Sequence, residues 1–252
     1  MHRIGTLILA LAVAGCGLRG PRLAVAPGTT AEGLFAGLEA RRAAVRSLRA
    51  RVQMRSGLAQ VWAREAVVVE RPSAVRVDVL SPFGLALALG TDGQTLWVFP
   101  PQERLRYEGS ATPENLARFL GAAVSSADLV NVLLGMPPQR IPSAPLRSEA
   151  LADGMVRVVV PFPNGEQRLE FAGRPAYVRR AEETRAGALV MRIDFDDYRD
   201  GFPWRMDVRG ASGAAASLRY VTIEPNVAVD PAVFRPPPAT RVLPLETIEV
   251  RR

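Results

Sequence analysis

The sequence predicts one α+β domain built on a strongly curved antiparallel sheet. We expect a half-open β-barrel of about nine to eleven strands, with an N-terminal helix and a helical lid. Apolar and polar residues alternate with a period of two over most of the chain after Leu48, as in strands with one covered face. One stretch at helical spacing precedes this pattern and two shorter ones interrupt it. A sheet with this many strands tends to curl.

The first residues are typical of a targeting segment. Arg3 precedes an apolar run from Ile4 to Ala14, which is too short to span a bilayer. Val13-Ala14-Gly15-Cys16 resembles the lipobox of bacterial lipoprotein signal peptides, and this resemblance implies cleavage before Cys16 and acylation of that single cysteine. The alternative is an ordinary signal peptide with a chance cysteine. Gly17, which follows the cysteine, resembles the residue found at this position in bacterial lipoproteins that are directed to the outer membrane.

These features divide the chain into three parts. We expect residues 1–15 to be a lipoprotein signal peptide, 16–28 a lipidated tether and 29–252 a single domain. No segment after residue 15 is long and apolar enough to span a membrane. Acyl chains on Cys16 would anchor the protein stably, because each buried methylene contributes about 0.8 kcal/mol. The resemblance at Gly17 implies that this anchor lies in the outer membrane, with the protein on its periplasmic face.

The chain is strongly basic. The formal net charge is +7, and all 32 basic residues are Arg. Removal of the leader, which contains Arg3 and no acidic residue, lowers this charge to +6. A secreted lipoprotein does not meet nucleic acid, so anionic lipid head groups are the partner that this charge favours. The alternative is a solvated, Arg-rich surface without a partner.

Three helices are expected. Thr29 and Glu32 form a capping box for the first, which continues to about Ser47. Pro113 suits the first position of the second helix, and Ser125 or Ser126 caps the third. A Pro-rich connector over residues 136–147 follows.

The stretch from Ser81 to Gly84 predicts an unusual hairpin. Pro82 and Gly84 favour a turn, and they place Phe83 at its tip. Loop tips normally face water. Phe83 is therefore either covered by another part of the chain or enters an apolar phase.

The inner face of the curved sheet is predicted to be apolar. A curled sheet with few covering helices can leave a cavity, and the same residues can equally form a packed core. The candidate lining residues are Val52, Met54, Val75, Val77, Leu87, Leu89, Trp97, Phe99, Phe119, Leu133, Ile193 and Phe195.

The residue inventory argues against an enzyme. The only His is His2, in the leader, and Lys is absent, which excludes Ser-His-Asp triads, His-based zinc sites and Schiff-base chemistry in the mature chain. Asp194 and Asp196 lie on the polar phase of a strand and are expected to be solvated. We expect no catalytic residues, no metal and no cofactor.

Two motifs resemble the LolA/LolB lipoprotein-localisation superfamily, and LolB in particular. Leu80-Ser81-Pro82-Phe83-Gly84 is similar to a strand that ends in an Asn-Pro-Leu-Gly turn, with Phe83 in place of Leu and Ser81 in place of Asn. The segment from Leu129 to Pro137 is similar to a helix that ends in Leu-Gly-x-Pro. The second half of the chain matches only in architecture.

The resemblance implies a lipid-anchored outer-membrane receptor. Its cavity would bind the acyl chains of lipoproteins, which a periplasmic LolA-like carrier would deliver. Phe83 would contact the membrane. We expect a monomer. The alternatives are a scaffold lipoprotein that docks onto an envelope machine, or a carrier of another lipid.

Overall fold

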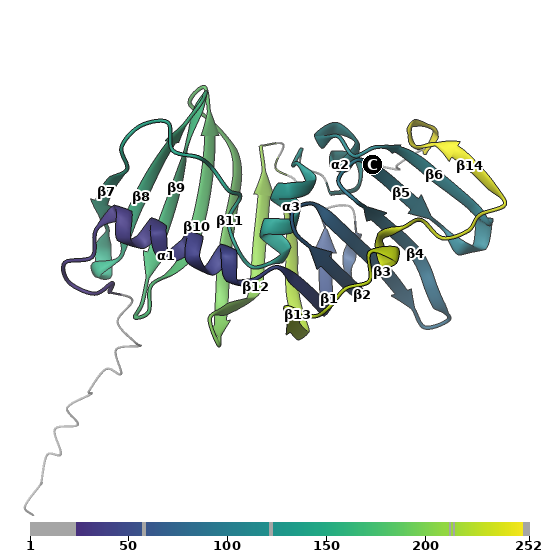
Figure 1. The fold of residues 1–252 in the computed structure, drawn as a ribbon, viewed down its shortest axis with the longest axis horizontal. Helices are drawn as coiled ribbons and strands as arrows, with labels where there is room; N and C mark the ends of the chain where they lie inside the picture. Colours follow the sequence, from purple (N-terminus) through teal and green to yellow (C-terminus); the bar gives the residue numbers. More distant parts are fainter. Residues whose placement is uncertain (1–23, 57–58, 121–122, 212, 214, 249–252) are drawn as a thin grey trace, which may run out of the picture.

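The protein folds around one unclosed, mostly antiparallel sheet of 14 strands (Figure 1). The computed structural model describes residues 24–56, 59–120, 123–211, 213 and 215–248. The strands are β1 (Ser47–Ser56), β2 (Ala59–Glu70), β3 (Ala74–Ser81), β4 (Gly84–Thr91), β5 (Thr95–Phe99), β6 (Leu105–Ser110), β7 (Arg147–Ala150), β8 (Val156–Phe162), β9 (Gly165–Ala172), β10 (Tyr177–Arg185), β11 (Ala188–Arg199), β12 (Phe202–Gly210), β13 (Ala215–Pro225) and β14 (Arg241–Pro244).

The sheet consists of two meanders joined along one seam. Its order is β14-β6-β5-β4-β3-β2-β1-β13-β12-β11-β10-β9-β8-β7. The first six strands follow each other in sequence, and β13 returns to pair with β1. Among the described strands, β14 and β6 are the one parallel pair, because the C-terminal segment crosses the sheet before it adds the last strand. The expected nine to eleven strands were too few, since the short edge strands β7 and β14 have little alternating pattern.

Helix α1 (Ala31–Ala44) begins one residue later than expected. Thr30, and not Thr29, is the N-cap: its side chain accepts a hydrogen bond from the Gly33 amide at 3.1 Å. The Thr29 hydroxyl instead donates to the Ala26 carbonyl at 2.7 Å, which closes the preceding turn. The helix ends at Ala44 because β1 starts only three residues later.

The chain packs against the domain before residue 29. Val25 is buried, and its amide donates to the Gly154 carbonyl at 2.9 Å. Cys16 and the rest of the predicted signal peptide and tether, up to residue 23, lie outside the described residues.

Helices α2 (Pro113–Leu120) and α3 (Ser126–Leu133) form where the sequence predicts them. The Ser125 side chain caps α3 by accepting from the Asp128 amide at 3.0 Å. A leading Pro and a capping hydroxyl both favour a helix start, which explains why these short helices were predictable. Figure 1 shows α1 across β8 to β11 and α3 near the middle of the sheet.

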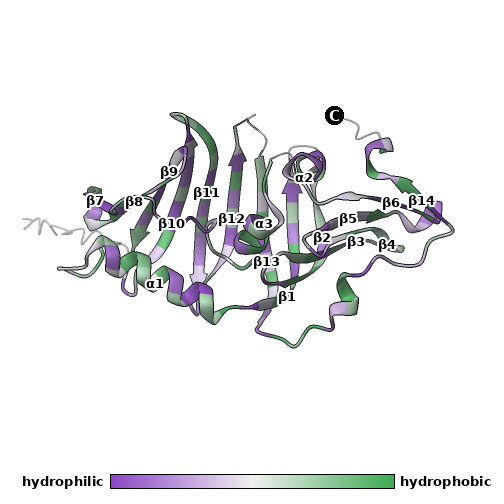
Figure 2. Ribbon diagram, turned by 45° about the horizontal axis from the view of Figure 1, so that its top comes forward, coloured by the Kyte–Doolittle hydropathy of each residue, from purple (hydrophilic) through white to green (hydrophobic). Residues whose placement is uncertain are grey.

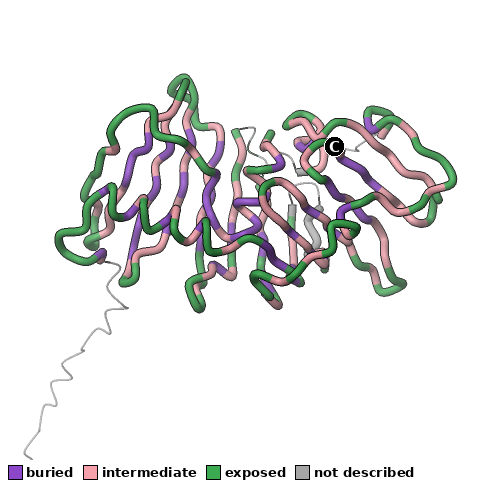
Figure 3. The backbone as a smooth tube through the Cα atoms, viewed as in Figure 1, coloured by how far each residue is buried: buried purple, intermediate pink, exposed green. Residues whose placement is uncertain are grey.

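All three helices pack on one face, which we call the helix-covered face. Side chains of α1 and α3 belong to one core with Val52, Val67 and Ile193, and Leu116 of α2 belongs to a second core with Leu96 and Val98. The opposite face, the outer face, carries the polar phase of the strands. Figure 2 shows the resulting bands of polar and apolar residues along β11 and β12, and Figure 3 shows the matching alternation of burial.

The C-terminal segment covers part of the outer face. The Trp97 indole Nε1 donates to the Phe234 carbonyl at 2.9 Å, and the Arg76 guanidinium lies 5.7 Å from the centre of the Trp97 ring. Gly90 leaves room for this ring, because a Cβ at that position would lie 2.5 Å from it. Two apolar layers therefore cover β3 to β5, one on each face.

Candidate functional site

Phe83 stands free at the tip of the β3–β4 hairpin. Its side chain is 100% exposed, and Leu80, at the base of the tip, is 43% exposed. No described part of the chain covers Phe83. Burial is the normal state of a Phe side chain, so this exposure is an exception that the local backbone must hold in place.

Ser81 and Gly84 hold the tip. The Ser81 hydroxyl donates to the Gly84 carbonyl at 3.0 Å and accepts from the Phe83 amide at 3.2 Å. Gly84 has a φ of +113°, which other residues rarely adopt. Ser81 thus forms the local side-chain turn that Asn residues commonly form, and its presence in place of Asn does not disrupt the hairpin.

Ten of the twelve predicted lining residues lie on the helix-covered face. Val52, Val75, Val77, Leu133, Ile193 and Phe195 are buried in the larger core, with Met54 and Leu89 packed against it. Leu87 and Phe119 pack against the smaller core. Most of these residues are fully covered, so they form the wall and the core beneath the helices and not the surface of an open cavity.

Trp97 and Phe99 were assigned to the wrong face. The register pairs Leu89 with Val98, so Val98 shares the helix-covered face with Leu89. Trp97 and Phe99 alternate with Val98 and therefore point to the outer face. The sequence Leu96-Trp97-Val98-Phe99 is apolar at every position, and its pattern alone does not distinguish the two faces.

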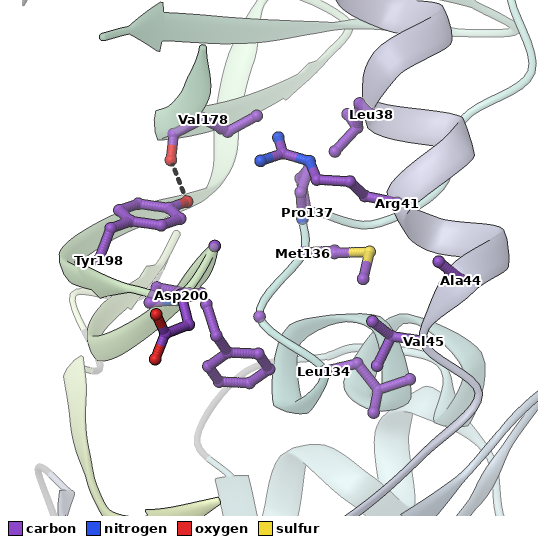
Figure 4. A pocket seen from close by; sticks show the side chains of 14 residues that line it. Leu38, Arg41, Ala44, Val45, Leu134, Met136, Pro137, Val178, Tyr198 and Asp200 are labelled. Atoms are coloured by element: carbon purple, nitrogen blue, oxygen red, sulfur yellow. Dashed lines mark hydrogen bonds between the residues drawn. The ribbon is translucent and has the colours of Figure 1, made fainter. Parts of the chain in front are cut away.

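A cavity of about 200 Å³ lies between α1 and the β11–β12 turn (Figure 4). None of the twelve predicted residues borders it. Its walls come from the C-terminal half of α1, the end of α3 and the starts of β10 and β12. The lining residues are Leu38, Arg41, Ala44, Val45, Leu134, Gly135, Met136, Pro137, Val178, Tyr198, Asp200, Gly201, Phe202 and Pro203.

Aromatic and charged groups close one side of this cavity. Tyr198 stacks on Tyr177 with 4.6 Å between ring centres, and its hydroxyl donates to the Val178 carbonyl at 2.6 Å. The Arg41 guanidinium lies 4.7 Å from the centre of the Tyr177 ring. Burial lowers the pKa of Arg41 and raises the pKa of Tyr198. The cavity is mainly apolar, with the Arg41 cation and the Asp200 carboxylate among its lining residues.

The Leu-Gly-x-Pro motif forms another wall. Gly135 has a φ of +75°, and a Cβ there would lie 2.7 Å from the Pro203 ring. Only glycine permits this close approach of the end of α3 to β12. The sequence pointed to Leu134-Gly135-Met136-Pro137 as a family motif but did not indicate that it borders a cavity.

A polar network that sequence reasoning missed ties the helices to the sheet. The Arg42 guanidinium donates to the Asn131 side-chain oxygen and, at 3.1 Å, to the Pro137 carbonyl. The Arg71 guanidinium donates to the same Asn131 oxygen at 2.8 Å and to the Val45 carbonyl at 2.8 Å. Burial, together with the nearby Arg42 charge, lowers the pKa of Arg71 to about 10. The network fixes α1 and α3 to the β2–β3 turn.

A second network fixes the connector after α3. Arg140 makes two hydrogen bonds to the Asp128 carboxylate, at 2.8 and 3.0 Å, and an ion pair with Glu183 at 2.7 Å. Glu183 is buried on β10. The connector, α3 and β10 are thus held together by charge-assisted hydrogen bonds.

One buried charge on the helix-covered face is not paired. Glu65 of β2 is 5% exposed, and within the described part of the chain it has no hydrogen-bond or ion-pair partner. Burial raises the pKa of its carboxyl from 4.5 to about 7.

Other chemical sites were also sought. Among the described residues no group of three or more His, Cys, Asp and Glu side chains is placed to hold a metal ion. No helix in that part of the chain is long and apolar enough to cross a membrane.

Comparison with known proteins identifies solved structures with a similar fold. No family model matches the sequence, and no curated protein sequence matches it. Among solved structures, a domain of a putative outer membrane lipoprotein-sorting protein from Vibrio parahaemolyticus is similar with a TM-score of 0.51 and 13% identity, over 81% of this chain and 97% of that one. A LolA superfamily protein from Nitrosomonas europaea is similar with a TM-score of 0.50 and 15% identity, over 76% and 90%.

The chain has a LolA-like fold. A DUF1329 family protein from Desulfovibrio piger shares it, with a TM-score of 0.53 and 13% identity over 82% of this chain and 98% of that one. All three identities are low, so the likeness concerns the fold. It agrees with the resemblance noted in the two sequence motifs, which lie on the β3–β4 hairpin and at the end of α3.

Proposed function

We propose that this chain is a lipid-anchored receptor at the outer membrane, which binds acyl chains beneath the helices of a LolA-like fold and passes lipoproteins into the bilayer. Acylated Cys16 would anchor it at the periplasmic face, and a LolA-like carrier would deliver the cargo. The observation that carries this proposal is the fully exposed Phe83 on a turn fixed by Ser81 and Gly84. No catalytic step is involved.

The free energy gained when the Phe83 side chain enters the bilayer is of the size expected for a reversible transfer step. Moving a Phe side chain from water into an apolar phase is worth about 1.5–3 kcal/mol. This is too little to anchor a protein and enough to favour a bilayer-bound orientation during cargo release. Because the Ser81 hydrogen bonds already order the turn, little conformational entropy is lost when Phe83 enters the membrane.

The test is transfer of a triacylated lipopeptide into liposomes by Cys16→Ala protein. We expect Phe83→Glu to slow insertion about tenfold or more, because a carboxylate resists entry into the bilayer. Phe83→Leu, which keeps a large apolar tip, should retain most of the activity. The thermal unfolding midpoints of all three proteins should agree, since the side chain makes no packing contacts. Equal insertion by Phe83→Glu and the parent would refute the role of the tip.

The scaffold alternative has a specific observation in its favour. The described cavity of about 200 Å³ is smaller than the roughly 300–1,000 Å³ typical of ligand pockets. An acyl chain would therefore have to displace α1 or the connector, or lie along half-buried residues elsewhere on the helix-covered face. Mass spectrometry of lipids that co-purify with Cys16→Ala protein separates the two: bound acyl species favour the receptor, and their absence favours the scaffold.

A further inference from the structure

Glu65 occupies a position where its neighbours in the sheet register are apolar. In the sheet register it lies between Val52 of β1 and Val79 of β3, and Ala63 and Val67 are its neighbours on the same face of β2. None of these side chains offers a hydrogen bond. The position is on the helix-covered face, where α3 packs against β2 and β3.

The other buried charges in the described chain are paired. Arg42 is held by Asn131 and Pro137, and Glu183 by Arg140 and Arg185. A carboxyl without such partners opposes folding, because burial removes most of its hydration and no described group replaces it. An apolar residue at this position would avoid that cost. No described residue supplies the donor that Glu65 lacks, and a bound ligand with a donor group would supply it.

The surroundings indicate what kind of partner fits. Val79 pairs directly with Leu87, and both are only half-buried, as is Met54, which follows Val52 by two residues on β1 and pairs with Ala63. These three residues continue the apolar wall beside Glu65 up to the end of the sheet that carries the Phe83 hairpin. A ligand that covers them would be an apolar chain, and its polar end would need a hydrogen-bond donor where it meets the carboxyl.

We propose that Glu65 is the polar anchor of the acyl-binding face: its carboxyl accepts a hydrogen bond from an N–H or O–H group at the head of an acylated ligand, while the chain lies on Met54, Val79 and Leu87. The proposal rests on the proposed function, and it adds a ligand class. Acyl amides and acyl compounds with a free hydroxyl are selected over simple esters, which carry no donor.

Two probes with the same chain test this selectivity. N-palmitoyl ethanolamine carries both an N–H and an O–H donor, and methyl palmitate carries neither. Binding to soluble Cys16→Ala protein is measured at pH 8.5 by displacement of a fluorescent fatty-acyl probe, because above a pKa of about 7 the Glu65 carboxylate accepts hydrogen bonds and cannot donate one to the ester carbonyl. We expect the amide to bind about tenfold more tightly than the ester, the gain that one hydrogen bond to a charged or buried group provides.

Substitutions at Glu65 test whether its carboxyl causes the preference for the amide over the ester. Glu65→Leu should bind both probes equally, and Glu65→Gln, which keeps an acceptor oxygen, should retain part of the preference. The matched control is Glu70→Leu, on the outer face of the same strand, which should leave the preference intact. Glu65→Leu removes an unpaired buried group, so it should raise the unfolding midpoint and will not be lost to misfolding.

The possible failures are distinguishable. If the parent binds both probes with equal affinity, or if Glu65→Leu keeps the preference, the anchor is refuted while acyl binding stands. If the parent binds neither probe nor the fluorescent reporter, acyl binding itself is refuted, and the anchor with it.

Discussion

Glu65 makes the stability of the fold depend on pH. Its pKa rises from 4.5 to about 7 on folding, so the folded state binds the proton more tightly than the unfolded state. The free energy of unfolding should therefore be highest below pH 4.5 with respect to this group, fall as the pH rises from 4.5 to 7, and level off above 7. The total loss is about 3 kcal/mol.

The measurement is urea unfolding of the parent and Glu65→Gln between pH 4 and 8. The Gln variant lacks the titrating group, so the difference between the two free-energy profiles isolates Glu65 from the other carboxylates. We expect the parent to lose stability relative to the variant as the pH rises. Parallel profiles would show that Glu65 is hydrated or paired in solution.

Sequence patterns identified exposed residues better than buried polar ones. The Pro and Gly around Phe83 predicted its place at a turn tip. Glu65 was overlooked although its signal was present, because it shares the phase of Val67 and Val69 within β2 and so falls on the apolar face. Trp97 could not be placed, because the carbonyl that binds its indole belongs to Phe234, far along the chain.

At the scale of elements, one amide on α3 joins two arginines to that helix. Asn131 accepts hydrogen bonds from both Arg42 and Arg71, and its own amide group donates to the Ala127 carbonyl at 3.0 Å. Asn131→Ala would leave two largely buried guanidinium groups without this acceptor. We expect the free energy of unfolding to fall by about 1–3 kcal/mol, measured by urea denaturation at unchanged m-value.

Asn115→Ala on α2 is the matched control. Its side chain makes one exposed hydrogen bond, to the Ser110 carbonyl at 2.9 Å, and should cost less than about 1 kcal/mol. The two substitutions are chemically identical and differ in burial and in the charge of their partners. A loss at Asn131 no greater than that at Asn115 would mean that α3 is held by its apolar contacts alone.

Elements with strong local signals were predictable, and those defined by distant partners were not. Helix caps and a leading Pro predicted the starts of α2 and α3, and the alternation of apolar and polar residues predicted most inner strands. β14 forms only because the tail pairs its Arg241–Pro244 segment with β6, and β7 is exposed along its whole length. The cavity was missed for the same reason, since its walls come from four segments that no local pattern links.

At the scale of the whole molecule, the two faces of the sheet have different roles. The helix-covered face holds both apolar cores, and the outer face of β1 and β2 carries exposed arginines. Arg64 pairs with Leu80, so this residue, with Arg55 of β1, lies at the end of the sheet that carries Phe83. Basic residues near an apolar tip are the arrangement expected of a surface that approaches anionic lipid.

This arrangement predicts salt-sensitive membrane binding. Cys16→Ala protein should bind vesicles that contain phosphatidylglycerol more tightly than vesicles of phosphatidylcholine, and the difference should disappear in 1 M salt, where the Debye length falls to about 3 Å. Replacing both Arg55 and Arg64 by Gln should weaken binding by about 1 kcal/mol per residue. Replacing Arg46 and Arg49, near the other end of β1, removes the same charge and should have less effect. Equal losses from the two pairs would show that only net charge matters, and that the Phe83 end of the sheet does not face the membrane.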